Sequence, residues 1–184
     1  MDSSIIDPEK FIMAFNKCRL EFEGKFLENW SKKKQFTDVF INELLPKIGK
    51  ELELNCYNGN YYYLDAIFYH KKFREYFEDN TTYAESLIIA FEHEHEHFRS
   101  HEEIYKLALF NAPLKVLVTY PPDEDEEQKL MKKFTDVLNR ADILKTFNSI
   151  HKHLVICGGK TPQDKKTMWT FYLYRNSNFE KLDQ

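Results

Sequence analysis

The segment from Glu92 to His97 alternates glutamate with histidine, and both residue types can bind metal ions or transfer protons. It directly follows Ser86 to Phe91, a short apolar run typical of a strand that is buried on both faces. Side chains alternate along an extended chain, so Glu92 and Glu94 share one face of the sheet while His93 lies on the other. Two carboxylates held this close repel each other unless a cation compensates, which predicts a site for a hard divalent ion.

Asp65 is a further candidate because it is the only acid between Tyr61 and Tyr69, where the other residues are aromatic or aliphatic. The alternation of polar and apolar residues from Leu52 to Tyr57, followed by Asn58-Gly59-Asn60, predicts a β-hairpin whose second strand contains Asp65. A buried carboxylate without a partner is costly. Asp65, on the strand adjacent to that of Glu92, therefore strengthens the prediction of a site for a hard divalent ion such as Mg²⁺.

An acid on a middle strand, followed by an apolar strand that ends in Glu-x-Glu, resembles the PD-(D/E)XK nuclease superfamily. The α-β-β-β-α-β core of that restriction-endonuclease-like fold matches this chain from about Gln35 to Tyr120. The resemblance places Asp65 at the family's Asp and Glu92 at the first acid of its (D/E)-x-K pair. Glu94 then occupies the usual Lys position, as Glu does in some restriction-type members of the family.

The resemblance implies metal-dependent hydrolysis of phosphodiester bonds in nucleic acid, with DNA favoured over RNA as the substrate. Asp65 and Glu92 would hold one or two Mg²⁺ or Mn²⁺ ions, and Glu94 would orient the attacking water or accept its proton. The family also has an acid on the preceding helix, for which Glu43 is our choice and Glu51 or Glu53 are substitutes. A homodimer would allow such a small nuclease to cut both strands.

Two other functional classes fit the same residues. His93-Glu94-His95-Glu96-His97 satisfies H-E-x-x-H, the zinc metallopeptidase motif in which both histidines bind zinc and the glutamate is the base. That motif requires a helix, whereas the apolar run before it favours a strand and Ser100 has the character of a new helix start. The third class is a non-catalytic binding module that retains the nuclease-like fold.

The elements that must position these residues follow the order α-α-β-β-β-α-β-α-β-β. We expect a single α/β domain over residues 1–184, with a mixed central sheet flanked by helices. It comprises an N-terminal helix (8–28), the nuclease-like core (35–120), and a C-terminal helix with two strands (123–175). Within this order the predicted elements are a helix capped by Ser31 and irregular near Pro46, strands 52–57, 61–69 and 86–91, a helix 100–110, strand 114–120, and strands 153–157 and 168–174.

Composition limits the classes of partner. The chain has 184 residues, with 26 Lys and Arg against 30 Asp and Glu, so it has no broad basic field and nucleic acid must be bound by a local patch. Candidates for that patch are the basic clusters Lys32–Lys34, Lys71–Arg74 and Lys160–Lys166. Three widely spaced cysteines suggest neither disulfides nor a thiolate zinc site. Without a basic apolar leader or a long apolar window, we expect a cytoplasmic protein without a membrane partner.

Overall fold

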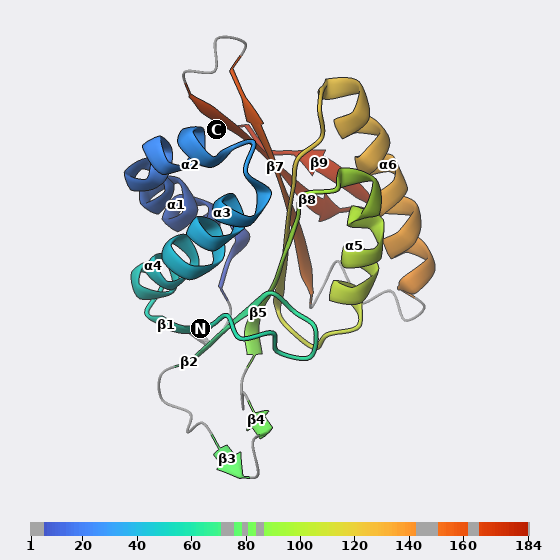
Figure 1. Cartoon of the computed structure of the whole chain (residues 1–184). Helices are drawn as coiled ribbons and strands as arrows, with labels where there is room; N and C mark the ends of the chain where they lie inside the picture. Colours follow the sequence, from blue (N-terminus) through green and yellow to red (C-terminus); the bar gives the residue numbers. More distant parts are fainter. Residues whose placement is uncertain are drawn as a thin grey trace. The chain divides into compact units, whose positions relative to one another are not determined.

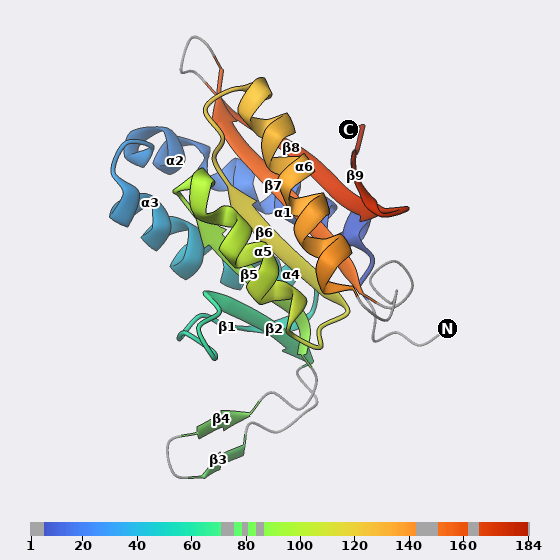
Figure 2. The ribbon, with the colours of Figure 1, turned by 90° about the vertical axis from the view of Figure 1, so that its right-hand side faces the viewer.

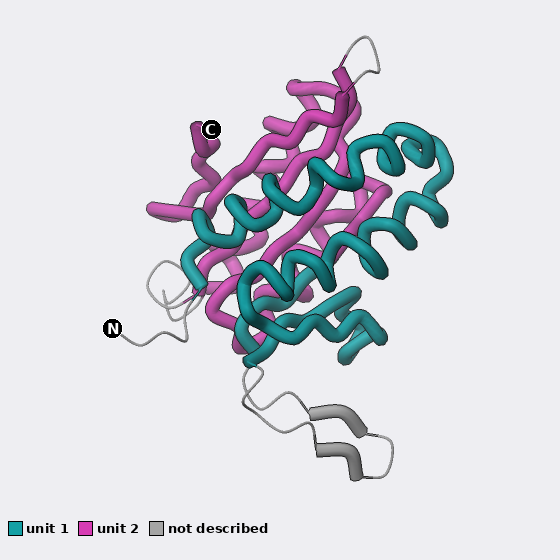
Figure 3. The backbone as a smooth tube through the Cα atoms, turned by 90° about the vertical axis from the view of Figure 1, so that its left-hand side faces the viewer, with its two compact units in different colours: residues 1–91 teal, residues 92–184 magenta. Residues whose placement is uncertain are grey.

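The computed structural model describes residues 6–70, 76–78, 81–83, 87–142, 151–161 and 166–183. The chain divides into two compact units, residues 1–91 and residues 92–184 (Figure 3). The division falls inside one continuous strand, β5 (Leu87–Glu94). That the whole chain is a single domain stays a prediction.

Unit 1 begins with a series of helices (Figure 1). The carboxylate of Asp7 caps the first by accepting a hydrogen bond of 2.9 Å from the Glu9 N–H, so the predicted helix start is confirmed. The second helical stretch begins at Lys33, with no side-chain cap, and the predicted cap at Ser31 is therefore wrong. The helices are α1 (Pro8–Arg19), the 3₁₀ turn η1 (Leu20–Phe22), α2 (Glu23–Asn29), α3 (Lys33–Asp38), the π-helical segment η2 (Val39–Leu44) and α4 (Leu45–Glu51).

The π-helical segment has its cause in Pro46. Proline lacks an N–H group, so the carbonyl of Asn42, four residues earlier, receives no helical hydrogen bond from it. The N–H of Leu45 instead donates to the carbonyl of Phe40, five residues earlier, which widens the turn. The predicted irregularity is confirmed, but it begins before the proline itself.

Aromatic side chains form much of the core of unit 1. Phe40 stacks on Phe91 of β5 with ring centroids 6.0 Å apart, and Phe11 meets Phe68 edge-on at 6.2 Å. All four rings are fully buried. Burial of each such side chain is worth roughly 1.5–3 kcal/mol, so these contacts hold the helices against the strands.

The strands of unit 1 pair antiparallel in the order β1-β2-β5. β1 (Leu54–Tyr57) and β2 (Ala66–His70) confirm the predicted hairpin, and Ala66 lies opposite Phe91 in the β2–β5 register. Two boundaries differ from the prediction. β2 begins at Ala66 rather than at Tyr61, and β5 continues to Glu94. The short pair β3 (Tyr76–Glu78) and β4 (Thr81–Tyr83) was not predicted.

Unit 2 is a βαβ unit extended by two strands. β6 (Leu114–Thr119) and β7 (Lys152–Lys160) are parallel, and β8 (Thr167–Arg175) and β9 (Asn178–Lys181) continue the sheet antiparallel. Figure 2 shows α5 (Ser100–Ala108) and α6 (Glu124–Ala141) side by side over one face of these strands. The 3₁₀ turn η3 (His97–Arg99) precedes α5. The predicted α/β class with a mixed sheet flanked by helices is confirmed, whereas β9 was not predicted.

Candidate functional site

Glu92 is a buried carboxylate with a cation beside it. Only 2% of the residue is exposed, and its Oε1 lies 2.8 Å from Nζ of Lys106 on α5. Glu103, one helical turn before Lys106, forms an ion pair with the same ammonium. Burial alone would lower the pKa of Lys106, but the hydrogen bonds that its ammonium donates to Glu103 and Glu92 raise it above its ordinary value. Lys106 therefore remains a cation between two carboxylates.

Sequence reasoning did not identify Lys106. It is the only lysine of α5, and it follows Glu103 at the i, i+3 spacing that brings two side chains together on a helix surface. A buried acid on a strand needs a cation nearby. The single lysine of the helix that follows the strand could therefore have been predicted as the partner of Glu92.

Glu94 is on the same strand, two residues further, and is half-buried. Its Oε1 accepts a hydrogen bond of 2.7 Å from the N–H of Glu96, which closes the turn at the end of β5. Glu94 thus has a local structural role, and its predicted role in orienting water stays a prediction.

His93 lies on the opposite face of β5 from Glu92, as the alternation predicted. Its Nε2 is 2.7 Å from the hydroxyl of Tyr120, and the ring of His95 stacks on Tyr120 with centroids 5.0 Å apart. The tyrosine ring also contacts Trp169 edge-on at 6.2 Å. Gly158 leaves room for this column of rings, since a Cβ there would be 2.5 Å from the Tyr120 ring.

The helix that the zinc metallopeptidase motif requires is not formed. His93 and Glu94 belong to β5, and His97 begins the 3₁₀ turn η3. Two histidines can bind one zinc ion in this motif only when they are one helical turn apart on the same face. The metallopeptidase interpretation is therefore wrong. Among the described residues, no group of three or more His, Cys, Asp or Glu side chains is placed to hold a metal ion.

Asp65 lies immediately before β2, in a bend, and is half-buried. The prediction that it occupies the interior of a strand is wrong, because the strand begins one residue later. Its neighbour Ala66 is fully buried and is paired with Phe91, the residue that precedes Glu92. Asp65 therefore adjoins the first paired residue of β2.

The three candidate helix acids lie at the surface of unit 1. Glu43, in η2, forms an ion pair with Lys25 of α2. Glu51, the last residue of α4, is 2.7 Å from Nζ of Lys17. Each of these two acids thus links neighbouring helices, while Glu53 follows α4 in the left-handed conformation, with φ 58°. The catalytic role of Glu43 stays a prediction.

Parts of the predicted basic patch can be placed. Lys33 and Lys34 begin α3, with Lys32 just before it, and Lys160 ends β7. Lys166 directly precedes β8. Lys71, Lys72, Arg74 and Lys165 lie outside the described residues.

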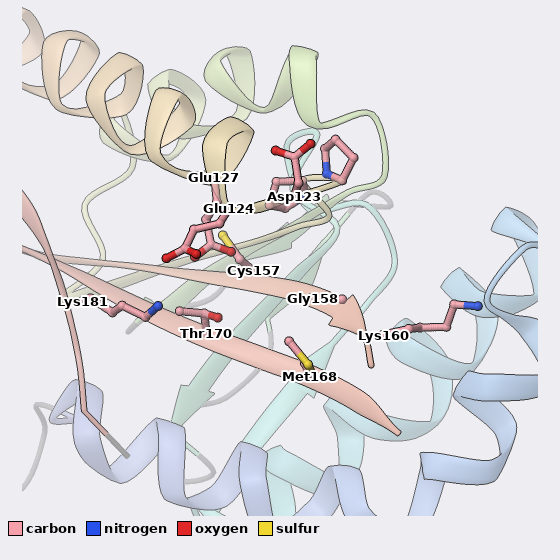
Figure 4. A pocket seen from close by; sticks show the side chains of 12 residues that line it. Asp123, Glu124, Glu127, Cys157, Gly158, Lys160, Met168, Thr170 and Lys181 are labelled. Carbon is pink, nitrogen blue, oxygen red and sulfur yellow. The ribbon is translucent and has the colours of Figure 1, made fainter. Parts of the chain in front are cut away.

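Unit 2 contains a pocket of about 250 Å³ that holds none of the predicted catalytic or metal-binding residues, although Lys160 of the predicted basic patch lines it (Figure 4). The first turn of α6 contributes carboxylates to one wall, and the facing ends of β7 and β8 form the other. Burial raises the pKa of the Cys157 thiol in this wall well above its ordinary value, which keeps the thiol protonated. The pocket-lining side chains labelled in the figure are Asp123, Glu124, Glu127, Cys157, Lys160, Met168, Thr170 and Lys181.

Acid is expected to destabilise the fold through His93. Burial, and then the neighbouring His95, hold the pKa of His93 well below its ordinary 6.5. The unfolded chain therefore takes up this proton at a higher pH than the folded chain. The stability that the neutral ring provides is complete above pH 6.5 and declines as the pH falls toward the lowered pKa, by about 1.4 kcal/mol per pH unit.

Urea unfolding of the wild type and of His93→Gln at several pH values measures this contribution. The wild-type free energy of unfolding should fall more steeply below pH 6.5 than that of the variant. Burial also lowers the pKa of His153, so this residue adds to the pH dependence of stability in every variant. The contribution of His93 is therefore the difference in slope between the wild type and His93→Gln. His101→Gln, at a partly exposed position, is the matched control. Equal slopes for His93→Gln and the wild type would contradict the expectation.

Among the described residues, no helix has both the length and the apolar character needed to cross a membrane. Comparison of the chain with protein-family models, with curated proteins and with solved structures gives no match. The function must therefore be inferred from the residues of the site.

Proposed function

We propose that this chain is a divalent-metal-dependent phosphodiesterase that acts on nucleic acid, with a restriction-endonuclease-like core over residues 35–120. The observation that carries the proposal is the buried carboxylate of Glu92 on β5, with the ammonium of Lys106 at 2.8 Å. Asp65 and Glu92 are the proposed metal ligands. DNA is the favoured substrate, and a homodimer would supply two sites for two strands.

The strand register supports the choice of ligands. Asp65 precedes Ala66, Glu92 follows Phe91, and Ala66 and Phe91 are opposite each other in antiparallel strands. Both candidates are carboxylates, and oxygen ligands are those that Mg²⁺ and Mn²⁺ prefer. When bound, such an ion would polarise the scissile phosphate and lower the pKa of a coordinated water.

Lys106 supplies the positive charge that the family's motif lysine would provide. Glu94 occupies the motif position, but Lys106 reaches Glu92 from α5 and Glu103 holds it there. Its side chain is 28% exposed, so a phosphate can approach the ammonium from solvent. A fixed cation at this point would stabilise negative charge that develops on the phosphate in the transition state. We assign this role to Lys106, and we keep Glu94 as the candidate base.

The direct test is cleavage of labelled oligonucleotides. We expect hydrolysis of single-stranded or duplex DNA, or of RNA, in Mg²⁺ or Mn²⁺ and none in EDTA, because the phosphate and water require a Lewis acid. The same ions should raise the melting temperature by mass action. A folded wild type that cleaves no substrate in Mn²⁺ would refute the proposal and leave the non-catalytic binding module.

A further inference from the structure

The turn from Tyr61 to Leu64 places two tyrosines in a backbone conformation that side chains of their size rarely adopt. The N–H of Leu64 donates to the carbonyl of Tyr61 at 2.9 Å, and φ is 47° at Tyr62 and 69° at Tyr63. Positive φ at both central residues is typical of type I′ turns, in which Asn-Gly is preferred. A bulky residue there is a conformational outlier that costs free energy.

Burial does not compensate for this strain. Tyr62 is 58% exposed and Tyr63 is 81% exposed, although the rings of Tyr61 and Tyr62 contact edge-on at 4.8 Å. The β8–β9 hairpin also has positive φ at both central residues, and there the positions are occupied by the short polar residues Asn176 and Ser177. The strained tyrosines are thus a feature that formation of the turn does not require. Strain that persists at an exposed position points to function.

The base of this turn is anchored. The side-chain amide of Asn58 donates to the carbonyl of Ile41 at 3.1 Å and to the Oδ1 of Asn42 at 2.9 Å. Gly59 packs against the ring of Tyr57 so closely that a Cβ would be 2.5 Å from it. The base of the turn is therefore attached to the helical layer of unit 1, which positions its backbone.

We propose that Tyr62 and Tyr63 form a stacking platform for an unpaired nucleobase, so that the substrate is single-stranded or locally unpaired nucleic acid. This rests on the proposed function, in which Asp65, two residues after Tyr63, binds the metal at the scissile phosphate. A base stacked on the turn would belong to a nucleotide next to that phosphate. No residue from Tyr57 to Leu64 is charged, which suits the face of a base better than a phosphate. Bases in a duplex are already stacked and cannot use such a platform.

The test replaces Tyr62-Tyr63 by Asn-Gly, which should change stability and binding in opposite directions. The melting temperature should rise because the new residues adopt positive φ without strain. Affinity for a fluorescently labelled single-stranded oligonucleotide, measured by anisotropy in EDTA so that cleavage cannot intervene, should fall roughly 5- to 150-fold.

Two control variants separate the rings from the strain. The double variant Tyr62→Phe, Tyr63→Phe keeps both aromatic faces and should bind like the wild type. Ser177→Gly relieves a residue of similar conformation in the β8–β9 turn, so it should raise stability and leave binding unchanged.

The proposed stacking platform would be refuted if the Asn-Gly variant bound as tightly as the wild type. It would also be refuted if the wild type bound duplex and single strand equally, or bound neither. If the Asn-Gly variant melted no higher than the wild type, the turn would not be strained and the proposal would lose its basis. The proposed hydrolysis fails separately. A wild type that binds single strands through these tyrosines but does not cleave them in Mn²⁺ retains the platform and refutes the phosphodiesterase.

Discussion

Metal-dependent cleavage of nucleic acid is expected to fall by at least about 100-fold in Asp65→Ala and to change little in His93→Gln. Asp65, immediately before β2, is one of the two proposed metal ligands, and its loss would leave only Glu92 to position the metal ion. His93 is on the opposite face of β5 from Glu92, where its Nε2 is 2.7 Å from the Tyr120 hydroxyl. Loss of its imidazole should therefore affect stability at low pH but leave the reaction intact.

Initial rates in Mn²⁺ for the two variants and the wild type provide the measurement, with circular dichroism to establish that each variant is folded. Asn is the milder replacement for Asp65 if the alanine variant fails to fold, because it keeps the shape and removes the charge. Undiminished cleavage by a folded Asp65 variant would be incompatible with the proposed ligand set. Loss of cleavage in His93→Gln above pH 7 would assign the chemistry to the other face.

Lys106→Met is expected to lower the free energy of unfolding by about 3 kcal/mol at pH 7. The substitution leaves the carboxylate of Glu92, whose side chain is 3% exposed, without the ammonium now 2.8 Å away. A buried charge that loses its partner carries most of its desolvation cost. Adding Glu92→Gln to this variant removes the orphaned charge and should restore most of the stability.

Urea unfolding of the wild type, Lys106→Met, Glu92→Gln and the double variant forms a complete thermodynamic cycle. Lys129→Met is the matched control, since Lys129 is 2.6 Å from Glu126 at the i, i+3 spacing that also joins Lys106 and Glu103, but its side chain is 70% exposed. Its loss should change the free energy of unfolding far less, because exposed ion pairs contribute little to stability. If Lys106→Met costs no more than this control, the Glu92–Lys106 pair does not hold the site together.

Much of the secondary structure could be predicted because local signals and tertiary contacts agree. Asp7-Pro8 both caps and starts the first helix, and the apolar run before Glu92 forms the expected strand. The predicted helix cap at Ser31 is wrong, because the helix begins at Lys33 and no side chain caps it. The two-residue alternation also placed Glu92 and His93 on opposite faces, since side-chain alternation is a local property of any strand.

The remaining features depend on contacts that are distant in sequence. β5 continues through Glu92 because Lys106, fourteen positions later, compensates its charge. From the sequence alone, an acid after an apolar run indicates the end of the strand. The turn at Tyr62 and Tyr63 was expected to be a strand because tyrosine favours strands and no glycine marked the turn. Asp65 was predicted inside this strand, which is wrong, because the turn before it leaves it as the residue that precedes β2.

The division of the chain at Phe91 and Glu92 places one of its two tryptophans in each compact unit. Trp30 packs edge-on against Phe36 with centroids 5.2 Å apart, and Trp169 has its edge-on contact with Tyr120. Each unit thus contains its own intrinsic fluorophore. Single Trp→Phe variants would allow the unfolding of each unit to be recorded by the fluorescence of the remaining tryptophan. Comparison of the two unfolding curves would measure whether the units, which share β5, unfold together.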